Sequence, residues 1–429
     1  MRSNNSEMAA SSPLAWGVVA LLHAAYALAF IDRLVIGLLA PSIGASLHLT
    51  DLQLGLLMGP AFAITYILAG LALGALVDRA RRLLIVGAAI LVWSAATMLC
   101  GLAGRFEALF AARVAVGIGE AAIAPAALSL IGDLFSRRRR PLAVGVFGFG
   151  VTLGASAAFI IGGLLMTTFR QAGVAEPWRL VFLSVGAPGL VLGIIALCLR
   201  EPRRRSTEAP SIRAAIAFAR ANGRLIAGHF LGFGVFATLS TAFGAWVPSI
   251  LMREHGMSVG EVGGVFGLIV LAGGLGGVVL GGGIAAALVR RGRADATLLT
   301  VLIGIGGGAI PAVLASLVAD PLACLGLFAA AFLFTSLASG ASLAALQDAT
   351  PARLRGQIGA LYYLILNLFG LTLGPLLAPL AARVWPGGGQ LGLALSLVSA
   401  LVSAIGFMAI LFARGAFVRA VGERAMETA

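Results

Sequence analysis

Four charged residues lie inside strongly apolar stretches of the chain, and their types and spacing suit proton exchange. Asp32 and Arg33 are adjacent, while Arg113 precedes Glu120 by seven residues, almost two turns of one helix face. An ionised group facing lipid costs roughly 2.5–3.5 kcal/mol, so we expect all four to face a wet cavity or one another. Burial disfavours an ionised carboxyl group and a nearby guanidinium favours it. Glu120 first, and Asp32 second, are therefore the candidate proton carriers, with a static salt bridge as the alternative.

The two guanidinium groups, on Arg33 and Arg113, favour a substrate that carries an anionic group. Tyr26, Tyr362 and Asn367 are further candidates for substrate contact. The alternatives are lipid-facing packing for the tyrosines and a hydrogen bond to a neighbouring helix for Asn367. We expect no metal site and no cofactor, because the three cysteines fall in separate apolar segments and the four histidines show no paired spacing.

Twelve apolar segments must position these residues. Hydrophobic residues make up 60% of the 429 residues and charged residues 11%. A helix needs roughly 20 residues to cross about 30 Å of hydrocarbon. The segments of sufficient length are 14–40, 52–77, 83–103, 107–131, 141–166, 180–199, 224–251, 259–288, 297–317, 321–346, 357–382 and 390–413. The sequence therefore predicts an all-α membrane protein with twelve transmembrane helices.

The arginines predict the orientation of these helices. The chain has no lysine, and all 30 basic residues are Arg. With the N-terminus inside, 23 of them fall on the inner side, five on the outer side and two within segments. The excess of positive charge predicts cytoplasmic termini and a multi-pass protein of the inner (plasma) membrane. The net charge of +13 is then a topology signal, and we expect no nucleic-acid partner.

An internal repeat divides the chain into two halves. Asp133 precedes Arg140 by seven residues, and Asp348 precedes Arg355 by the same spacing 215 residues later. Repeats on this scale are typical of transporters whose halves rock about a midplane site. The domains that we expect are a tail at 1–13, a six-helix bundle at 14–199, a cytoplasmic linker at 200–223, a second bundle at 224–413 and a tail at 414–429.

Several motifs resemble those of the major facilitator superfamily. Residues 74–82 (GALVDRARR) resemble its loop between helices two and three, although one glycine is absent and the loop is a residue short. Residues 113–120 (RVAVGIGE) resemble its fourth-helix motif, and with 30–33 (FIDR) they look like the Spinster-related branch. The resemblance covers nearly the whole chain and implies two pseudo-symmetric six-helix bundles. Helix five keeps a glycine ladder, but residues 158–159 are Ala-Phe where the antiporter signature has Gly-Pro.

The resemblance also implies a gating network at the cytoplasmic ends of the helices. It groups Asp78 with Arg79 and Arg82, and Asp133 with the arginines at 137–140. Plain orientation signalling explains the arginines equally well, but it does not explain the aspartates. The residues expected to gate are Asp78, Arg79, Arg82, Asp133, Asp348 and Arg355.

The function that we expect is secondary active transport by alternating access, coupled to protons, of an amphipathic lipid-like or organic anionic solute. Spinster-like relatives imply lysophospholipids or sphingoid phosphates. A drug or amphiphile efflux antiporter and a small organic anion symporter are the alternatives within this class. A membrane-embedded enzyme or a non-transporting receptor is disfavoured, because no convergent nucleophile–base or metal set is visible. The expected partners are the solute, protons and the lipid bilayer, with the chain acting as a monomer.

The predicted orientation can be tested by cysteine labelling in intact cells. Single cysteines at positions 2, 210 and 425 should resist an impermeant thiol reagent until the cells are permeabilised, because all three positions are expected to be cytoplasmic. Labelling of these positions from outside would overturn the predicted arrangement.

Overall fold

The computed structural model confirms an all-helical membrane protein. It describes residues 13–77, 79–136, 138–201, 204, 212–384 and 390–428, without the side chains of 212 and 425–428. Twelve of its helical segments are long and apolar enough to cross a membrane, as predicted. Within the described residues, α-helices and two short 3-10 turns are the regular elements. The predicted position of Asp78 lies outside the described residues.

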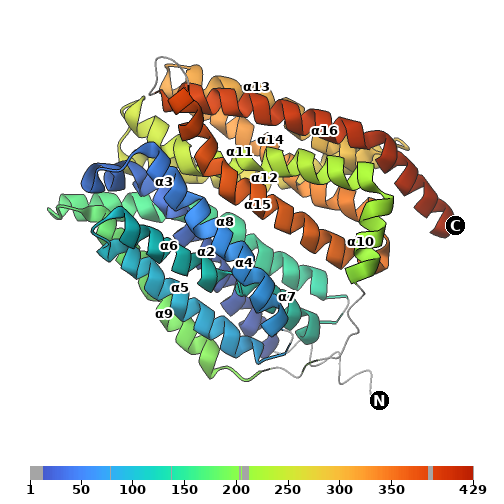
Figure 1. Cartoon of the computed structure of the whole chain (residues 1–429), viewed down its shortest axis with the longest axis horizontal. Coiled ribbons are helices and arrows are strands. Elements are labelled where there is room, and N and C mark those ends of the chain that lie inside the picture. The colour runs from blue at the N-terminus through green and yellow to red at the C-terminus, as the bar shows by residue number, and fades with distance from the viewer. Residues whose placement is uncertain are drawn as a thin grey trace. The chain divides into compact units, whose positions relative to one another are not determined.

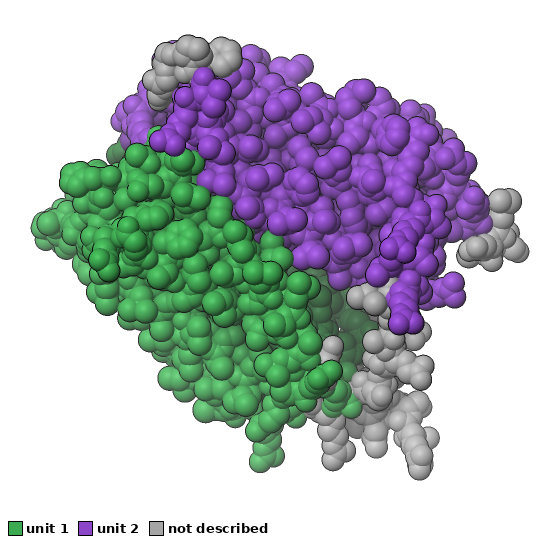
Figure 2. All heavy atoms as spheres, viewed as in Figure 1, with its two compact units in different colours: residues 1–207, 258–267 green, residues 208–257, 268–429 purple. Residues whose placement is uncertain are grey.

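The chain divides into two compact units, which are coloured separately in Figure 2. The first comprises residues 1–207 with 258–267, and the second comprises 208–257 with 268–429. The helices are α2 (Pro13–Leu47), α3 (Asp51–Met58), α4 (Pro60–Val77), α5 (Arg82–Leu102), α6 (Phe106–Glu120), α7 (Ile123–Leu134), α8 (Arg140–Gln171), α9 (Pro177–Cys198), α10 (Ile212–Ala221), α11 (Gly223–Arg253), α12 (Val259–Arg290), α13 (Ala296–Leu314), α14 (Pro321–Ala349), α15 (Arg355–Val384) and α16 (Leu391–Thr428). The predicted bundle and linker boundaries stay a prediction.

Proline and glycine determine where two of the predicted spans break. The second span divides into α3 and α4 at Gly59-Pro60, and the fourth divides into α6 and α7 after Glu120. Pro125 explains the second break, because proline has no N–H to offer the carbonyl of Ala121 and its ring clashes with that carbonyl. Glu120 is thereby the last residue of α6, at a joint inside the span.

Several helices extend beyond the apolar segments that predicted them. The last segment was expected to end at 413, but α16 continues to Thr428 through residues that favour helix. The first was expected to end before Pro41, but α2 continues through this proline to Leu47. A proline is tolerated within a transmembrane helix where neighbouring groups satisfy the freed backbone. Apolar length thus underestimates helix length at both ends of the chain.

The same packing plan recurs in both units. In the first unit α2 packs on α8, and α5 runs beside α9 (Figure 1). In the second unit α11 packs on α15, and α13 packs on α16. These are the first–fifth and third–sixth span pairs of each unit, so the packing follows the internal repeat.

The repeated Asp and Arg spacing has a structural explanation at the end of one helix in each unit. Nη2 of Arg140 donates to the carbonyl oxygen of Gly132 at 2.6 Å, and Nε of Arg355 donates to that of Gln347 at 3.1 Å. In both cases the arginine opens one helix and binds a carbonyl in the last turn of the helix before it. Such terminal carbonyls have no partner within their own helix, and a cation suits the negative end of the helix dipole.

Asp295 ties two helices of the second unit together. Its carboxylate accepts hydrogen bonds from Nε of Arg293 at 2.8 Å and from Nε of Arg414 at 2.7 Å, and its side chain is buried. The hydrogen bond from Arg293, followed by that from Arg414, lowers the pKa of Asp295 to about 2. The clamp therefore joins the loop before α13 to α16.

A close approach between α2 and α8 requires glycine at position 154. A Cβ atom there would overlap the backbone of Ala27, and one at Gly150 would lie 2.9 Å from the carbonyl oxygen of His23. At Gly145, by contrast, an added Cβ meets nothing within 4 Å. The glycine ladder of helix five is therefore a packing surface for α2 at Gly150 and Gly154.

We predict that Gly154→Ala destabilises the protein by about 1–3 kcal/mol, because the added methyl group forces α2 and α8 apart. Gly145→Ala is the matched control and should be neutral or slightly stabilising, since alanine favours helix and the site is open. The measurement is thermal unfolding in detergent and in liposomes. Equal melting temperatures for the two variants would contradict the packing role of Gly154.

We also predict that Asp295→Asn lowers stability at neutral pH by about 1–2 kcal/mol, since the partner arginines are partly exposed and screened. Because the folded pKa lies below the unfolded value, this contribution is present above about pH 4 and fades as the pH falls toward 2. The stability gap between wild type and variant should therefore narrow on acidification. Glu107→Gln, at an exposed pair 3.9 Å apart, is the control and should change little.

Candidate functional site

A buried ion pair links two helices of the first unit. Nη2 of Arg33, on α2, donates to Oε2 of Glu120, on α6, at 2.6 Å. The Arg33 side chain is 8% exposed and that of Glu120 is 0% exposed, so the pair is shielded from solvent. The helical spacing placed Glu120 on the face of Arg113, but the direct partner in the structure is Arg33. The break that Pro125 causes makes Glu120 the last residue of α6, so the regular helical spacing from Arg113 does not determine the partner of Glu120.

Three aromatic rings surround the guanidinium group of Arg33. Its Cζ atom lies 4.5 Å from the ring centre of Phe62, 4.6 Å from that of Phe30 and 5.0 Å from that of Tyr66. Rings at these distances attract a cation through their quadrupole, and the effect strengthens where water is excluded. Arg33 therefore keeps part of its stabilisation if its carboxylate partner changes.

Arg113 binds the backbone carbonyl of Asp32 and forms no ion pair with its carboxylate. Arg113 donates from Nη1 to the carbonyl oxygen of Asp32 and from Nε to that of Leu57, each at 3.3 Å. Leu57 lies in the last turn of α3, where carbonyls have no partner within their own helix. The Asp32 carboxylate instead accepts a hydrogen bond from the hydroxyl of Thr97, on α5, at 3.1 Å. The structure thus brings all four predicted charges together, each with a different partner.

Each of the four charged residues has one buried polar atom that forms no hydrogen bond with the described residues. Oδ1 of Asp32, Nε of Arg33, Nη2 of Arg113 and Oε1 of Glu120 are buried without a hydrogen-bond partner among the described residues. Buried polar atoms are normally satisfied, and exceptions indicate a bound water, ion or ligand, or a functional group. Two donors and two acceptors are therefore available to a proton, an anionic group or water.

A row of aromatic side chains leads to Arg33 along α2. Tyr26 stacks on Phe147 of α8 with ring centres 4.5 Å apart, and Phe30 meets Tyr26 edge-on at 5.2 Å. Phe30 in turn contacts Arg33. Tyr26 and Phe30 are both partly exposed. This row, Phe147–Tyr26–Phe30, places a chain of aromatic rings beside a cation.

The other two predicted substrate residues belong to the second unit, on α15. The hydroxyl of Tyr362 donates to Oγ of Ser342 at 2.8 Å, and Ser342 lies 3.1 Å from Nε2 of His229. All three side chains are buried, so Tyr362 binds within its own unit. Asn367 is partly exposed on the same helix.

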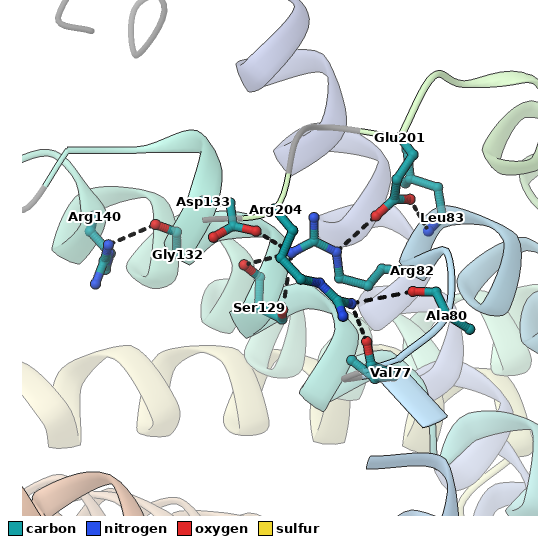
Figure 3. Close-up of polar contacts among 10 residues, drawn as sticks. All are labelled: Val77, Ala80, Arg82, Leu83, Ser129, Gly132, Asp133, Arg140, Glu201 and Arg204. Atoms are coloured by element: carbon teal, nitrogen blue, oxygen red, sulfur yellow. Dashed lines mark hydrogen bonds and ion pairs between the residues drawn. The ribbon is translucent and has the colours of Figure 1, made fainter. Parts of the chain in front are cut away.

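The predicted gating residue Arg82 is the centre of a second polar cluster, shown in Figure 3. Its guanidinium group forms ion pairs with Asp133, at the end of α7, and with Glu201, after α9, the latter at 2.8 Å. It also donates to the hydroxyl of Ser129 at 3.1 Å. We call Arg82, Asp133 and Glu201 the Arg82 clamp. It joins the starts or ends of three helices of the first unit.

The remaining predicted gating residues take simpler positions. Arg79 is exposed beyond the end of α4. The ion partner of Asp133 is Arg82 and not Arg140, which binds Gly132, while position 137 lies outside the described residues. Asp348 accepts a hydrogen bond from Thr297 at 2.9 Å. Thr297 and Asp348 follow Arg82 and Asp133 by 215 residues. The hydrogen bond from the Thr297 hydroxyl to Asp348 therefore takes the place, in the second unit, of the Arg82–Asp133 ion pair in the first.

Sequence reasoning missed several residues of these clusters. Glu201 and Arg204 were read only as part of a linker, yet Glu201 joins the clamp and Arg204 donates to the carbonyl oxygen of Val77 at 2.5 Å. An acidic residue in a basic segment was the available signal for Glu201. Thr97 and Phe62 gave no signal, because an uncharged side chain in an apolar segment is ordinary.

Comparisons with known proteins agree with this architecture. A sequence model described as the Major Facilitator Superfamily matches residues 22–375. An MFS-type efflux pump of Mycolicibacterium smegmatis is 28% identical over 419 residues, which cover 96% of this chain and 95% of that protein. The sphingosine-1-phosphate transporter of Danio rerio is 28% identical over 236 residues, but these cover only 53% of this chain and 45% of that protein.

A solved structure shows the same fold along almost the whole chain. It is the crystal structure of a bacterial homologue of the human lysosomal transporter Spinster, in an inward-facing and unoccupied conformation. The TM-score is 0.80 at 27% identity, and the match covers 96% of this chain and 98% of that chain. The chain therefore belongs to the Major Facilitator Superfamily and, within it, resembles the Spinster-related branch.

Proposed function

We propose that the protein is a secondary active transporter that couples protons to the movement of an amphipathic or organic anion by alternating access. The observation that carries the proposal is the buried Arg33–Glu120 ion pair, with a free polar atom on each partner. A static salt bridge stabilises a membrane protein only when the remaining donors and acceptors of the pair are also hydrogen-bonded, so unsatisfied atoms argue against a purely structural role. A pair that exchanges partners during transport needs such unsatisfied atoms, because they can bind the incoming solute or proton.

The coupling step follows from competition for Arg33. An anionic group that binds Arg33 displaces the Glu120 carboxylate, which is then a buried charge without compensation. Such a carboxylate takes up a proton, because the neutral acid is far cheaper to bury. One anion and one proton thus bind together without a change in the net charge of the site. By linkage, each favours the binding of the other.

Asp32 provides a second carboxyl group for proton exchange. Its partners are a hydroxyl group and a backbone contact, so protonation breaks no ion pair. Arg113 lies against its backbone and supplies a second cation for an anionic headgroup. We assign proton exchange to Glu120 and Asp32, and anion binding to Arg33 and Arg113.

An amphipathic solute fits the surroundings of Arg33 better than a fully polar one. The row Phe147–Tyr26–Phe30 offers aromatic faces beside the guanidinium group, as an apolar tail with a charged head requires. The name of the Danio rerio relative supports the same class, while that of the Mycolicibacterium smegmatis relative supports efflux as the direction of transport. A small organic anion is the other candidate. Tyr362 and Asn367 stay separate proposed solute contacts within the second unit.

We assign gating to the cytoplasmic helix ends. The Arg82 clamp is formed by helix termini that a change in access state would separate or rejoin. Asp78, Arg79, Asp348 and Arg355 belong to the same proposal. We further propose cytoplasmic termini, the inner (plasma) membrane, and a monomer that needs no cofactor and leaves its solute covalently unchanged.

The solute can be identified by an uptake screen in proteoliposomes with an imposed pH gradient. The panel consists of lysophospholipids and sphingoid phosphates, organic anions and cationic dyes. We expect accumulation of an anionic amphiphile that depends on the gradient. Transport of cationic dyes alone, or no gradient-dependent movement of any solute, would contradict the proposal.

We predict that Glu120→Gln abolishes pH-driven accumulation but permits downhill movement, because glutamine keeps the size of the side chain and fixes its neutral state. The apparent affinity for the anion, which in the wild type should rise up to about tenfold per unit fall in pH, should become independent of pH. Flux is measured with and without a pH gradient, and Glu107→Gln is the exposed control.

A structural salt bridge predicts a different result. Glu120→Gln would then express poorly, and Arg33→Gln in the same chain would restore folding by removing the uncompensated cation. Arg113→Gln serves as the comparison, because Arg113 does not pair with Glu120. Full gradient-driven accumulation by a folded Glu120→Gln would remove Glu120 as the coupling residue and leave Asp32.

A further inference from the structure

We propose that Thr97 is a positioning residue that sets the pH at which Asp32 exchanges its proton. The inference rests on the proposed function only in treating Asp32 as a proton carrier. Its structural basis is the hydrogen bond from the Thr97 hydroxyl on α5 to Oδ2 of Asp32 on α2, at 3.1 Å. Both side chains are 1% exposed, so no solvent competes with this contact.

The bond of Thr97 differs from those of other threonines in the membrane helices. A threonine hydroxyl within a helix commonly donates to the carbonyl four residues earlier. Thr167, Thr300 and Thr335 do so at 2.7–2.8 Å, and Thr168 does so at 2.9 Å. Thr65 and Thr241 also donate to a backbone carbonyl of another helix, but Thr97 donates across helices to a charged side chain. Its hydroxyl is therefore used for Asp32 and not for its own backbone.

The Asp32 carboxylate depends on this bond more than an ion-paired carboxylate would. Oδ1 has no hydrogen-bond partner among the described residues, and no ion pair of Asp32 is found among them. Ionisable groups on the neighbouring elements are Arg33, His23 and Tyr26 on α2, Arg113, Glu120 and Glu107 on α6, Cys100 and Arg82 on α5, Asp51 on α3 and Asp133 on α7. Those of α8 and α9, Arg140, Arg170, Arg179 and Cys198, lie at the helix ends.

Within the cluster, each cation already has a partner other than the Asp32 carboxylate. Arg33 donates to Glu120, and Arg113 donates to two backbone carbonyls. The neutral hydroxyl of Thr97 is thus the direct hydrogen-bond donor to the ionised form of Asp32. A hydrogen bond to the charged form favours that form, so its removal favours protonation.

The consequence is a shift in the titration of Asp32. Thr97→Val keeps the shape of the side chain but removes the donor, so Asp32 should hold its proton to higher pH, by about one unit. Thr97→Ser keeps the hydroxyl and should titrate as the wild type does. Thr168→Val removes a back-bonded hydroxyl elsewhere and is the matched control.

Infrared difference spectroscopy of the full chain in liposomes tests the proposal without a substrate. The protonated carboxyl band that disappears in Asp32→Asn belongs to Asp32, and its midpoint is followed as the pH is varied. We expect an alkaline shift in Thr97→Val and none in Thr97→Ser or Thr168→Val. If Thr97→Val does not fold, Thr97→Ala removes the hydroxyl without branching and carries the same expectation.

The outcomes separate this inference from the proposed function. An unchanged midpoint in Thr97→Val, an equal shift in Thr97→Ser, or an Asp32 that does not titrate in the wild type would overturn the role of Thr97. A shifted midpoint in a protein that moves no solute under a pH gradient would uphold the role of Thr97 and contradict coupled transport. Where transport is found, the pH profile of flux should shift with the infrared midpoint.

Discussion

The ion pair between Arg33 and Glu120 is the constraint around which the first unit is arranged. Charged groups in hydrocarbon are tolerated only when their neighbours compensate them. The chain compensates each charge with a different group: a carboxylate and aromatic rings for Arg33, backbone carbonyls for Arg113 and a hydroxyl group for Asp32. The helix break after Glu120 and the break at Gly59-Pro60 belong to the same arrangement, because both place helix ends at the cluster.

The two units share a packing plan, but the central residue of the ion-pair clamp has the opposite charge in each unit. In the first unit a cation, Arg82, holds two carboxylates, and in the second a carboxylate, Asp295, holds two cations. Each clamp joins the third span of its unit to the sixth. The geometry of the repeat is therefore kept while the charges are exchanged. Equivalent positions in the two halves do not have equivalent chemistry, and a residue role cannot be transferred between halves by its position alone.

Much of the fold could be predicted from the sequence, because hydrocarbon imposes a length and a composition on every spanning helix. The twelve spans and the twofold plan were predicted and are confirmed. The four charges, which stand out in apolar segments, are buried and lie together in the structure, while their roles stay a prediction. Their pairing was not predicted, because helical spacing relates Glu120 to Arg113 but says nothing of the distance between helices.

The contacts that sequence patterns could not reveal are those made by ordinary residues across helices. Thr97, Phe62 and Asp295 each gain their role from a partner far away in the chain. Glu201 was within reach of the pattern but was assigned to a linker. The helix break near Pro125 could not be predicted either, because a membrane helix can continue through a proline, as α2 does at Pro41.

The proline joint between α6 and α7 has a mechanical consequence. The joint lies at Ala121 and Ala122, just before the helix turn that contains Pro125, whose missing N–H leaves the carbonyl of Ala121 without its helical partner. Glu120 lies at one side of this elbow and Asp133, a member of the Arg82 clamp, lies 13 residues farther along, roughly 20 Å at the rise of a helix. The ion pair and the clamp therefore hold one span at two places, at its internal joint and at its end. A change of partner at Glu120 would therefore act on the same span that carries Asp133 into the Arg82 clamp.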